Sequence, residues 1–434
     1  MDYHSRDKNI GIFKKQDEIS RGGEAFMEYK IYRYRWAVVG IFWLLIFTYG
    51  ANWFALSPML KTFESNFSIP PWESHLLISL IGMFVIFFAW PAGTLVDRRG
   101  PKISISIGAF FMALGFGLRP WLLHNFYTLM LSSVIAGVGL AWILVALAPQ
   151  MLRWFPRKNA SLPVGIAASG LFIGFGTGSL LMPLLTPDKT DNTQIFNGFL
   201  AFAILAVIAF FLWLVIAKDH PAMPPEEQVA VTKMKFSEGM KHVFSSSNAF
   251  YYPVIGFFIV GITLVISAFI HSPLYATSAL AQEGGYIAGL LLYGCAVGAF
   301  TAPFLVRRIG LKKVTLGVVA GAIVLWLILF ALFAMKAYDA SNLSWILVAV
   351  LAFFFGFCFQ ASWPLALFSQ ETEKGVTDAN VGIAASLYIS VSNIGAAVLP
   401  VIFPILFPTA MATFIAVLGG LFICILLWGI MKRT

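Results

Sequence analysis

The chain has 434 residues, of which 59% are hydrophobic and only 11% are charged. A soluble globular domain carries about twice that charged fraction, so the composition excludes a soluble domain and indicates a membrane protein. A net charge of +9 is also typical of proteins that bind nucleic acid. Here, however, the Lys and Arg residues flank the apolar segments, and we therefore expect no nucleic-acid partner.

Twelve apolar stretches follow one another along the chain. A helical span needs ~20 apolar residues to cross ~30 Å of hydrocarbon, and each stretch is long enough to do so. The predicted spans cover residues 36–59, 74–96, 103–123, 126–150, 160–185, 195–217, 250–272, 286–306, 314–335, 343–368, 380–405 and 409–431. The predicted fold class is therefore an all-α polytopic membrane protein with twelve transmembrane helices.

The positive charges predict the orientation of these spans. With the N-terminus inside, all but four of the 29 Lys and Arg residues fall on the inner side; the exceptions are Lys61, Arg119, Lys189 and Lys336. This is the positive-inside bias, so we expect both termini in the cytoplasm and a multi-pass protein of a plasma or inner membrane. Residues 1–35 are polar, and we expect a cytoplasmic tail there without a cleavable signal peptide.

The chain divides at its longest polar stretch between spans. We expect a tail at 1–35, a six-helix bundle at 36–217, a cytoplasmic linker at 218–248 and a second six-helix bundle at 249–434. Two strings repeat across the linker. VGIAAS at 164–169 recurs 217 residues later at 381–386, and GTLVDRRG at 93–100 pairs with PFLVRRIG at 303–310, an offset of 210. Repeats at nearly one spacing predict two pseudo-symmetric bundles.

The string GTLVDRRGPK at residues 93–102 joins the second and third predicted spans. It resembles the loop at this position in the major facilitator superfamily. The resemblance implies the fold of that superfamily and secondary transport by rocker-switch alternating access. It also implies a conformational latch between the bundles, in which a glycine permits close helix approach and an acid accepts bonds from a helix N-terminus. The matching residues are Gly93, Asp97, Arg98 and Gly100, with Arg307 in the second copy.

Polar and aromatic residues at helical spacing predict the wall of a central cavity. This fold lines its cavity with spans one, seven and ten and with part of span eleven, and polar side chains recur on single faces of these spans. The candidate substrate-binding residues are Tyr49, Asn52, Trp53, Ser267, His271, Gln360, Trp363 and Asn393. For any single Ser or Thr, a hydrogen bond to a neighbouring helix is the better interpretation.

A narrower resemblance suggests a substrate class. Residues 32–58, with the Asn52–Trp53 pair, resemble the start of the FLVCR-type branch, whose members move choline, ethanolamine and heme; SPLYATSAL at 272–280 adds Tyr275. The resemblance implies an aromatic box that holds an ammonium group by cation–π attraction. The glutamines that this branch carries in its fifth and eleventh spans are absent, with Ser169 or Gly170 and Asn393 in their places.

Other functions remain open on the sequence alone. The scarcity of acids and the presence of Arg119 favour a small mono- or dicarboxylate as the alternative substrate. For Arg119, however, snorkelling or a structural pair is the stronger interpretation. A substrate-sensing receptor on the same fold is the alternative of another class. No Asp or Glu lies in the middle of a span, which favours facilitated diffusion or coupling to an ion through His271 over a carboxylate proton relay.

The sequence carries no signature of an enzyme. It has no metal cluster, Walker loop or nucleophile elbow. We therefore expect no catalytic residues, no metal and no cofactor. The expected partners are a small-molecule substrate, the lipid bilayer and a coupling ion, and we expect a monomer.

Overall fold

The computed structural model describes residues 30–225, 234–270, 284–335, 345–377, 379–407 and 409–431, and the regular elements in these ranges are helices. The first half of the chain contains α1 Arg35–Phe54, η1 Ser57–Met59, α2 Leu60–Phe67, α3 Pro71–Arg99, α4 Pro101–Leu118, η2 Arg119–Leu122, α5 Phe126–Val145, α6 Leu147–Trp154, α7 Arg157–Leu185 and α8 Asn192–Ile216. The second half contains α9 Phe236–Val243, α10 Asn248–Ile270, α11 Gly284–Ile309, α12 Leu311–Ala334, α13 Trp345–Gln360, α14 Ser362–Glu371, α15 Val381–Leu406 and α16 Ala410–Ile430.

The described residues contain twelve helical segments that are long and apolar enough to cross a membrane, which confirms the predicted fold class. The first span differs most from its prediction, because η1 and α2 extend it to Phe67. Large apolar side chains such as Phe87 and Val215 are 65% and 82% exposed. Exposed apolar surface of this kind fits contact with lipid.

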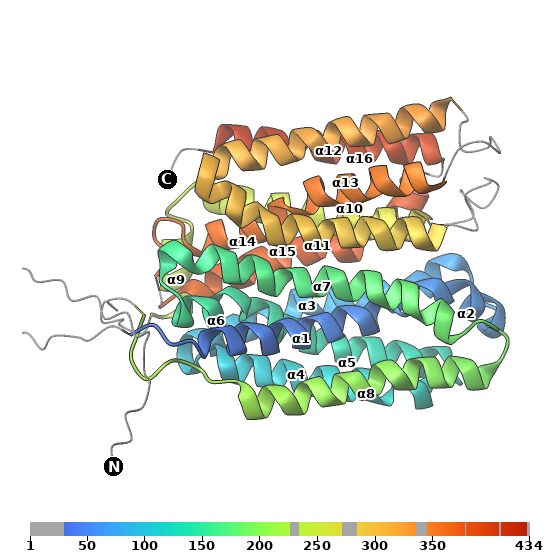
Figure 1. The fold of residues 1–434 in the computed structure, drawn as a ribbon, viewed down its shortest axis with the longest axis horizontal. Helices are drawn as coiled ribbons and strands as arrows, with labels where there is room; N and C mark the ends of the chain where they lie inside the picture. Colours follow the sequence, from blue (N-terminus) through green and yellow to red (C-terminus); the bar gives the residue numbers. More distant parts are fainter. Residues whose placement is uncertain are drawn as a thin grey trace, which may run out of the picture.

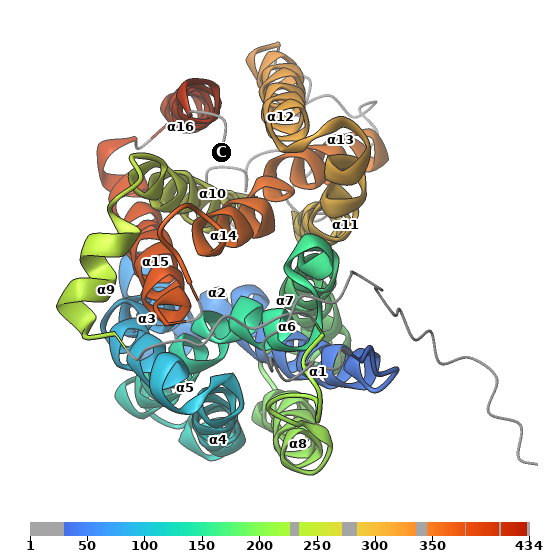
Figure 2. The same cartoon turned by 90° about the vertical axis from the view of Figure 1, so that its left-hand side faces the viewer.

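The helices form two groups that lie side by side (Figures 1 and 2). We call α1–α8 the N-half and α10–α16 the C-half. The end of the bundle at which α1 begins and α16 ends is the inner end. The short helix α9 lies at this end and packs against α15. The halves touch mainly where α3 meets α15 and α7 meets α11.

Two spans are interrupted at equivalent places in the halves. The helix α5 ends at Val145 before α6, and α13 ends at Gln360 before α14. A proline follows each end by four residues, Pro149 and Pro364. Because proline has no N–H, it cannot bond the carbonyl four residues before it, and those carbonyls belong to Val145 and Gln360. The two prolines lie 215 residues apart, close to the spacing of the repeated strings.

The repeated loops fold alike. Gly100 separates α3 from α4, and Gly310 separates α11 from α12. Their φ angles are 94° and 89°, in the region that glycine adopts without strain. The alignment of Gly100 with Gly310 therefore reflects a shared backbone turn.

Candidate functional site

The repeated strings meet across the halves at the inner end. Gly93 of α3 packs on Gly382 of α15, and a methyl group on Gly93 would overlap Ser386 Oγ and the Gly382 carbonyl oxygen. A methyl group on Gly382 would lie 2.5 Å from the Gly93 carbonyl oxygen. Glycine at both positions allows the two backbones to approach this closely.

Asp97 joins the halves one turn further along α3. Its Oδ1 accepts a hydrogen bond of 2.8 Å from the backbone N–H of Gly382. That N–H is one of the donors left without a helical partner at the start of α15, where the helix dipole also favours a negative charge. Arg98 is exposed beside it. The acid therefore binds a helix N-terminus of the opposite half.

The pseudo-symmetric contact lies between α7 and α11. A methyl group on Gly165, the counterpart of Gly382, would lie 2.8 Å from the Ala299 carbonyl oxygen and 2.8 Å from Pro303 Cγ. Arg307 stands in the place of Asp97, and its Nη2 donates to the Asn159 carbonyl oxygen at 3.3 Å. Each signature segment thus contacts the VGIAAS segment of the other half.

Two residues at the inner end were missed by the sequence analysis. Asp219 accepts a bond of 3.0 Å from the backbone N–H of Lys102 at the start of α4 and forms an ion pair with Arg153. A methyl group on Gly100 would lie 2.6 Å from Arg153 Nη1 and 2.8 Å from the Asp219 carboxylate. The available signal was the position of Asp219, the first acid after the sixth span.

The contact between α3 and α15 continues from the inner end toward the middle of the bundle. Ser386 Oγ donates to the Ala89 carbonyl oxygen at 2.8 Å, and Ser390 Oγ donates to the Ile86 carbonyl oxygen at 3.2 Å. These serines are four residues apart and so share a face of α15. With the Asp97 bond, they join α3 to α15 across the two halves.

A small cavity lies between the halves in the middle of the bundle. Its volume is about 30 Å³, too small for an organic solute. The cavity is lined by Trp53, Leu140, Leu144, Leu171, Phe172, Phe175, Val260, Thr263, Leu264, Gln360, Trp363 and Asn393. Four of the predicted substrate-binding residues, Trp53, Gln360, Trp363 and Asn393, therefore come together here, and the lining within the described ranges holds no charged side chain.

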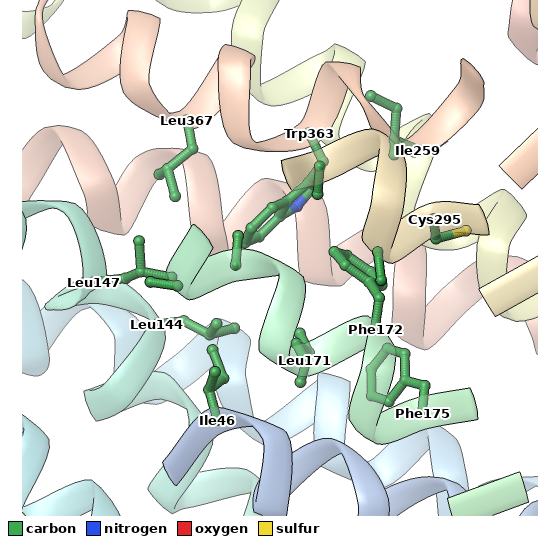
Figure 3. Packing of buried hydrophobic residues seen from close by; sticks show 14 of the residues in the cluster. Ile46, Leu144, Leu147, Leu171, Phe172, Phe175, Ile259, Cys295, Trp363 and Leu367 are labelled. Atoms are coloured by element: carbon green, nitrogen blue, oxygen red, sulfur yellow. The ribbon is translucent and has the colours of Figure 1, made fainter. Parts of the chain in front are cut away.

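Aromatic rings run through this cavity from one half to the other. The ring centroids of Trp53 and Phe175 are 5.3 Å apart, those of Phe175 and Phe172 are 5.7 Å apart, and those of Phe172 and Trp363 are 6.1 Å apart. All three pairs are edge-to-face, the arrangement that aromatic quadrupoles favour. Figure 3 shows Trp363 reaching from the C-half toward Leu144 and Phe172 of the N-half.

The cavity also presents hydrogen-bond donors. Gln360 Oε1 accepts a hydrogen bond of 3.0 Å from Thr263 Oγ1, so the amide nitrogen of Gln360 points away from Thr263. Within the described ranges, neither Gln360 Nε2 nor Trp363 Nε1 has a hydrogen-bond partner, although both atoms are buried. A buried indole N–H normally has an acceptor, so this pair can bind an acceptor group on a solute.

Two candidate residues on α1 lie outside the cavity lining. The hydroxyl group of Tyr49 donates to the Ala136 carbonyl oxygen at 2.6 Å. Asn52 Nδ2 donates to the carbonyl oxygens of Phe202 and Thr48, both at 3.0 Å. Both side chains are thus satisfied by backbone groups within the N-half and turn away from the cavity.

Arg119 is buried inside the N-half, with 1% of its surface exposed. It donates to the Asn52 carbonyl oxygen at 2.7 Å and to Ser132 Oγ at 3.1 Å. Its guanidinium carbon lies 4.6 Å from the centre of the Phe116 ring. The sequence analysis offered snorkelling or a structural pair for Arg119. The structure shows no snorkelling to the membrane surface, because the side chain bonds the carbonyl end of α1.

Three candidates from the seventh span cannot be placed. The side chain of Ser267 and the whole of His271 and Tyr275 lie outside the described residues. The cavity walls contributed by α7 were missed as well. The glycines of α7 pack on α1: a methyl group on Gly170 would lie 2.8 Å from the Trp43 carbonyl oxygen. Phe172 and Phe175 of the same helix line the cavity, and the sequence analysis did not consider them.

Comparisons with known sequences point to one family. A sequence model described as "Major Facilitator Superfamily" matches residues 42–375. The chain is 26% identical over 220 residues to the mouse protein named "Choline/ethanolamine transporter FLVCR1". The aligned segment covers 46% of this chain and 39% of the mouse protein. It is also 33% identical over 158 residues to a rice protein named "Probable anion transporter 3, chloroplastic", covering 36% of this chain and 29% of that one.

Comparison with solved structures gives the same fold. The crystal structure of FucP, a transporter of the same superfamily in the outward conformation, matches with a TM-score of 0.71 at 14% sequence identity. The match covers 93% of this chain and all of FucP. By contrast, each of the two sequence matches covers less than half of the relative's length.

Proposed function

The chain belongs to the major facilitator superfamily, and from that premise we propose that it carries a small organic amine related to choline or ethanolamine across the membrane. The family match and the twelve spans make it a multi-pass membrane transporter. Alternating access follows from the fold: two halves rock about a central site.

The proposed substrate class rests on the lining of the central cavity. Its rings from Trp53, Phe172, Phe175 and Trp363 offer electron-rich faces and edges, and no charged side chain stands among its described lining. A desolvated cation–π contact contributes about 2 kcal/mol, so several rings can replace the hydration of an ammonium group. The N–H groups of Gln360 and Trp363, which have no partner among the described residues, would bind the hydroxyl group that choline and ethanolamine share.

Solute entry requires the halves to separate around this cavity. A volume of about 30 Å³ is far below the ~300 Å³ typical of small-molecule sites. The rings of Phe172 and Trp363 belong to opposite halves, so separation would break their contact and free both faces. We infer that the solute replaces this ring pair as the bridge between the halves.

A small organic anion is the second candidate. Arg119 places a buried positive charge in the N-half, over the Phe116 ring that packs on Tyr49. The N–H donors of Gln360 and Trp363 suit a carboxylate as well as a hydroxyl group. The likeness to the rice protein named as an anion transporter supports the same candidate. We rank it second because the Arg119 side chain faces helix backbone and serine hydroxyls.

The orientation and the latch form part of the proposal. We place both termini in the cytoplasm of a plasma or inner membrane, so the inner end faces the cytoplasm. Gly93, Asp97 and Gly100, with Arg307 in the second copy, then close the cytoplasmic side while the solute site exchanges with the outside. We propose that one chain is sufficient for transport, because the cavity is built from the two halves of one molecule.

Solute counterflow in proteoliposomes tests the proposal. Vesicles loaded with unlabelled choline should take up labelled choline, whereas vesicles loaded with succinate should not. Trp363→Ala should abolish this exchange. Trp121→Ala is the matched control, because Trp121 is 57% exposed and is not part of the cavity lining. Exchange with succinate but not with choline or ethanolamine would refute the amine and favour the anion.

Thermal unfolding of the purified protein gives an independent binding measurement. A solute at one hundred times its dissociation constant should stabilise the protein by ~2.7 kcal/mol. We expect this shift with choline in the native protein and in Trp121→Ala, and we expect it to be lost in Trp363→Ala. An equal shift in all three proteins would contradict binding in the cavity.

A further inference from the structure

A second, larger cavity lies at the inner end of the molecule. The helices α3, α6 and α9 each pack against α15 at this end (Figure 2). The cavity has a volume of about 1040 Å³, and it shares no lining residue with the central cavity. Sites for small molecules have volumes of about 300–1,000 Å³. The inner cavity is therefore large enough to hold an organic solute.

Three parts of the chain form the wall of this cavity. The N-half contributes the end of α3 and part of α6. The polar segment between the halves contributes residues such as His220 and Lys235, and the C-half contributes Ala379 and Val381 at the start of α15. A molecule bound here would therefore contact both halves and the segment that joins them.

The charged side chains of the lining are mostly positive. Arg98, Arg99, Arg153 and Lys235 line the cavity, together with one acid, Asp97. Asp97 Oδ1 already accepts a bond from the start of α15. The positive-inside bias explains why basic residues gather at this end, but it does not require them to face a common cavity. The shared cavity indicates a site for an anion.

Asp219 shows how this region binds a negative group. Its carboxylate accepts a bond of 3.0 Å from the backbone N–H of Lys102 at the start of α4, and it pairs with Arg153. The first N–H groups of a helix favour an anion in this way. The chain's own carboxylate therefore occupies Arg153 and the start of α4.

The remaining three cations of the lining have no such partner. Within the described ranges, Arg98, Arg99 and Lys235 take part in no ion pair, and all three residues are exposed. A guanidinium group presents a planar fork that binds two phosphate oxygens at once, whereas an ammonium group acts as a point charge. Two forks and one point charge around one cavity suit a phosphate group better than a single carboxylate.

We propose that the inner cavity binds a phosphate-bearing anion and that the bound anion favours the inner-closed form. Its effect on transport rests on the proposed transport function, whereas the binding itself does not. If α15 moved away from α3, the part of the wall formed by Ala379 and Val381 would leave the cavity. A ligand that binds one form more tightly shifts the population toward that form, so the anion would keep the halves together at this end.

Thermal unfolding of the detergent-purified protein with inorganic pyrophosphate tests the binding. Pyrophosphate should raise the unfolding temperature of the native protein more than sodium chloride of equal ionic strength does. Lys235→Gln and Arg99→Gln should each raise the apparent Kd about tenfold, because each removes one charge-assisted contact. Lys241→Gln is the matched control, since Lys241 is exposed on α9 but is not part of the lining. Equal shifts in all four proteins would overturn the site.

The same measurement in lipid nanodiscs distinguishes a soluble anion from a lipid headgroup. Nanodiscs of phosphatidylcholine alone are compared with nanodiscs that also contain phosphatidic acid. Stabilisation by phosphatidic acid that Lys235→Gln loses, and that pyrophosphate does not reproduce, would identify a lipid headgroup as the source of the phosphate. Stabilisation by neither phosphatidic acid nor pyrophosphate would overturn the site.

Counterflow measurements test the preference for the inner-closed form. Pyrophosphate on both sides of the proteoliposome membrane should slow choline exchange several-fold in the native protein and in Lys241→Gln, but not in Lys235→Gln. An unchanged rate in a native protein that binds pyrophosphate would refute the conformational effect. Absence of exchange with every solute would refute the proposed transport function, while the unfolding measurements would still decide whether the anion binds.

Discussion

Replacing Gly93 by alanine adds one methyl group where α3 and α15 approach most closely. In the inner-closed structure this methyl group would overlap Ser386 Oγ and the Gly382 carbonyl oxygen. The hydroxyl group cannot turn aside without losing its bond to the Ala89 carbonyl oxygen. The carbonyl oxygen belongs to the first turn of α15 and can move only with the helix. The substitution should therefore push the halves apart at the inner end.

The size of the effect follows from the cost of overpacking. An extra methyl group in a well-packed interface costs about 1–3 kcal/mol. In the proposed inner-open state α3 and α15 would separate, so the cost would fall on the closed state alone. A difference of ~1–3 kcal/mol changes the ratio of the two states by about 5- to 150-fold. Gly93→Ala should therefore shift the population strongly toward the inner-open state.

Distances between spin labels measure this shift. Cysteines at Arg99 and Lys374, which are exposed on opposite halves at the inner end, would carry the labels in a background without the native cysteines. We expect Gly93→Ala to move the distribution to longer distances. Gly317→Ala is the control, because a methyl group there meets no atom within 4 Å while helix propensity rises equally. Native distances in a well-folded Gly93→Ala protein would refute the latch.

Two other substitutions test neighbouring parts of the argument. Asp97→Ala leaves the backbone N–H of Gly382 without its acceptor, at a cost of about 1–3 kcal/mol, so the same labels should report opening of similar size; unchanged distances would show that Asp97 does not hold the halves. Arg119→Leu leaves the Asn52 carbonyl oxygen without its donor, at a cost of about 1–3 kcal/mol. We expect a lower unfolding temperature in lipid nanodiscs, and an unchanged temperature would mean that the buried guanidinium group contributes nothing.

The two halves use their repeated segments differently. In the N-half the signature acid Asp97 accepts from a helix N-terminus of the other half. In the C-half Arg307 takes the equivalent place and donates to a backbone carbonyl. A carboxylate facing a helix N-terminus gains from the dipole, whereas a guanidinium group gains from a carbonyl oxygen. The shorter of the two bonds, 2.8 Å against 3.3 Å, lies on the α3–α15 side, where we expect opening to be controlled.

The spans and their grouping could be predicted because they depend on local composition. Lipid requires every backbone group to be satisfied within a helix, so a run of apolar residues is sufficient to specify a span. The repeated strings and the loop at residues 93–102 then identified the superfamily. The turn glycines Gly100 and Gly310 could be aligned for the same reason, since a positive φ angle is a local requirement.

Partners across the halves depend on the packing of distant helices. Helical spacing placed Tyr49 and Trp53 on one face of α1, yet the Tyr49 hydroxyl group bonds α5 while Trp53 reaches the cavity. Phe172 carried no polar signal, and its role follows from its contact with Trp363 of the other half. The sequence by itself determined the membrane, the twelve helices and the repeat, because each of these follows from neighbours along the chain. Only the tertiary structure decided that Asp97 meets Gly382 and that Phe172 meets Trp363, because these pairs join segments that are distant in sequence.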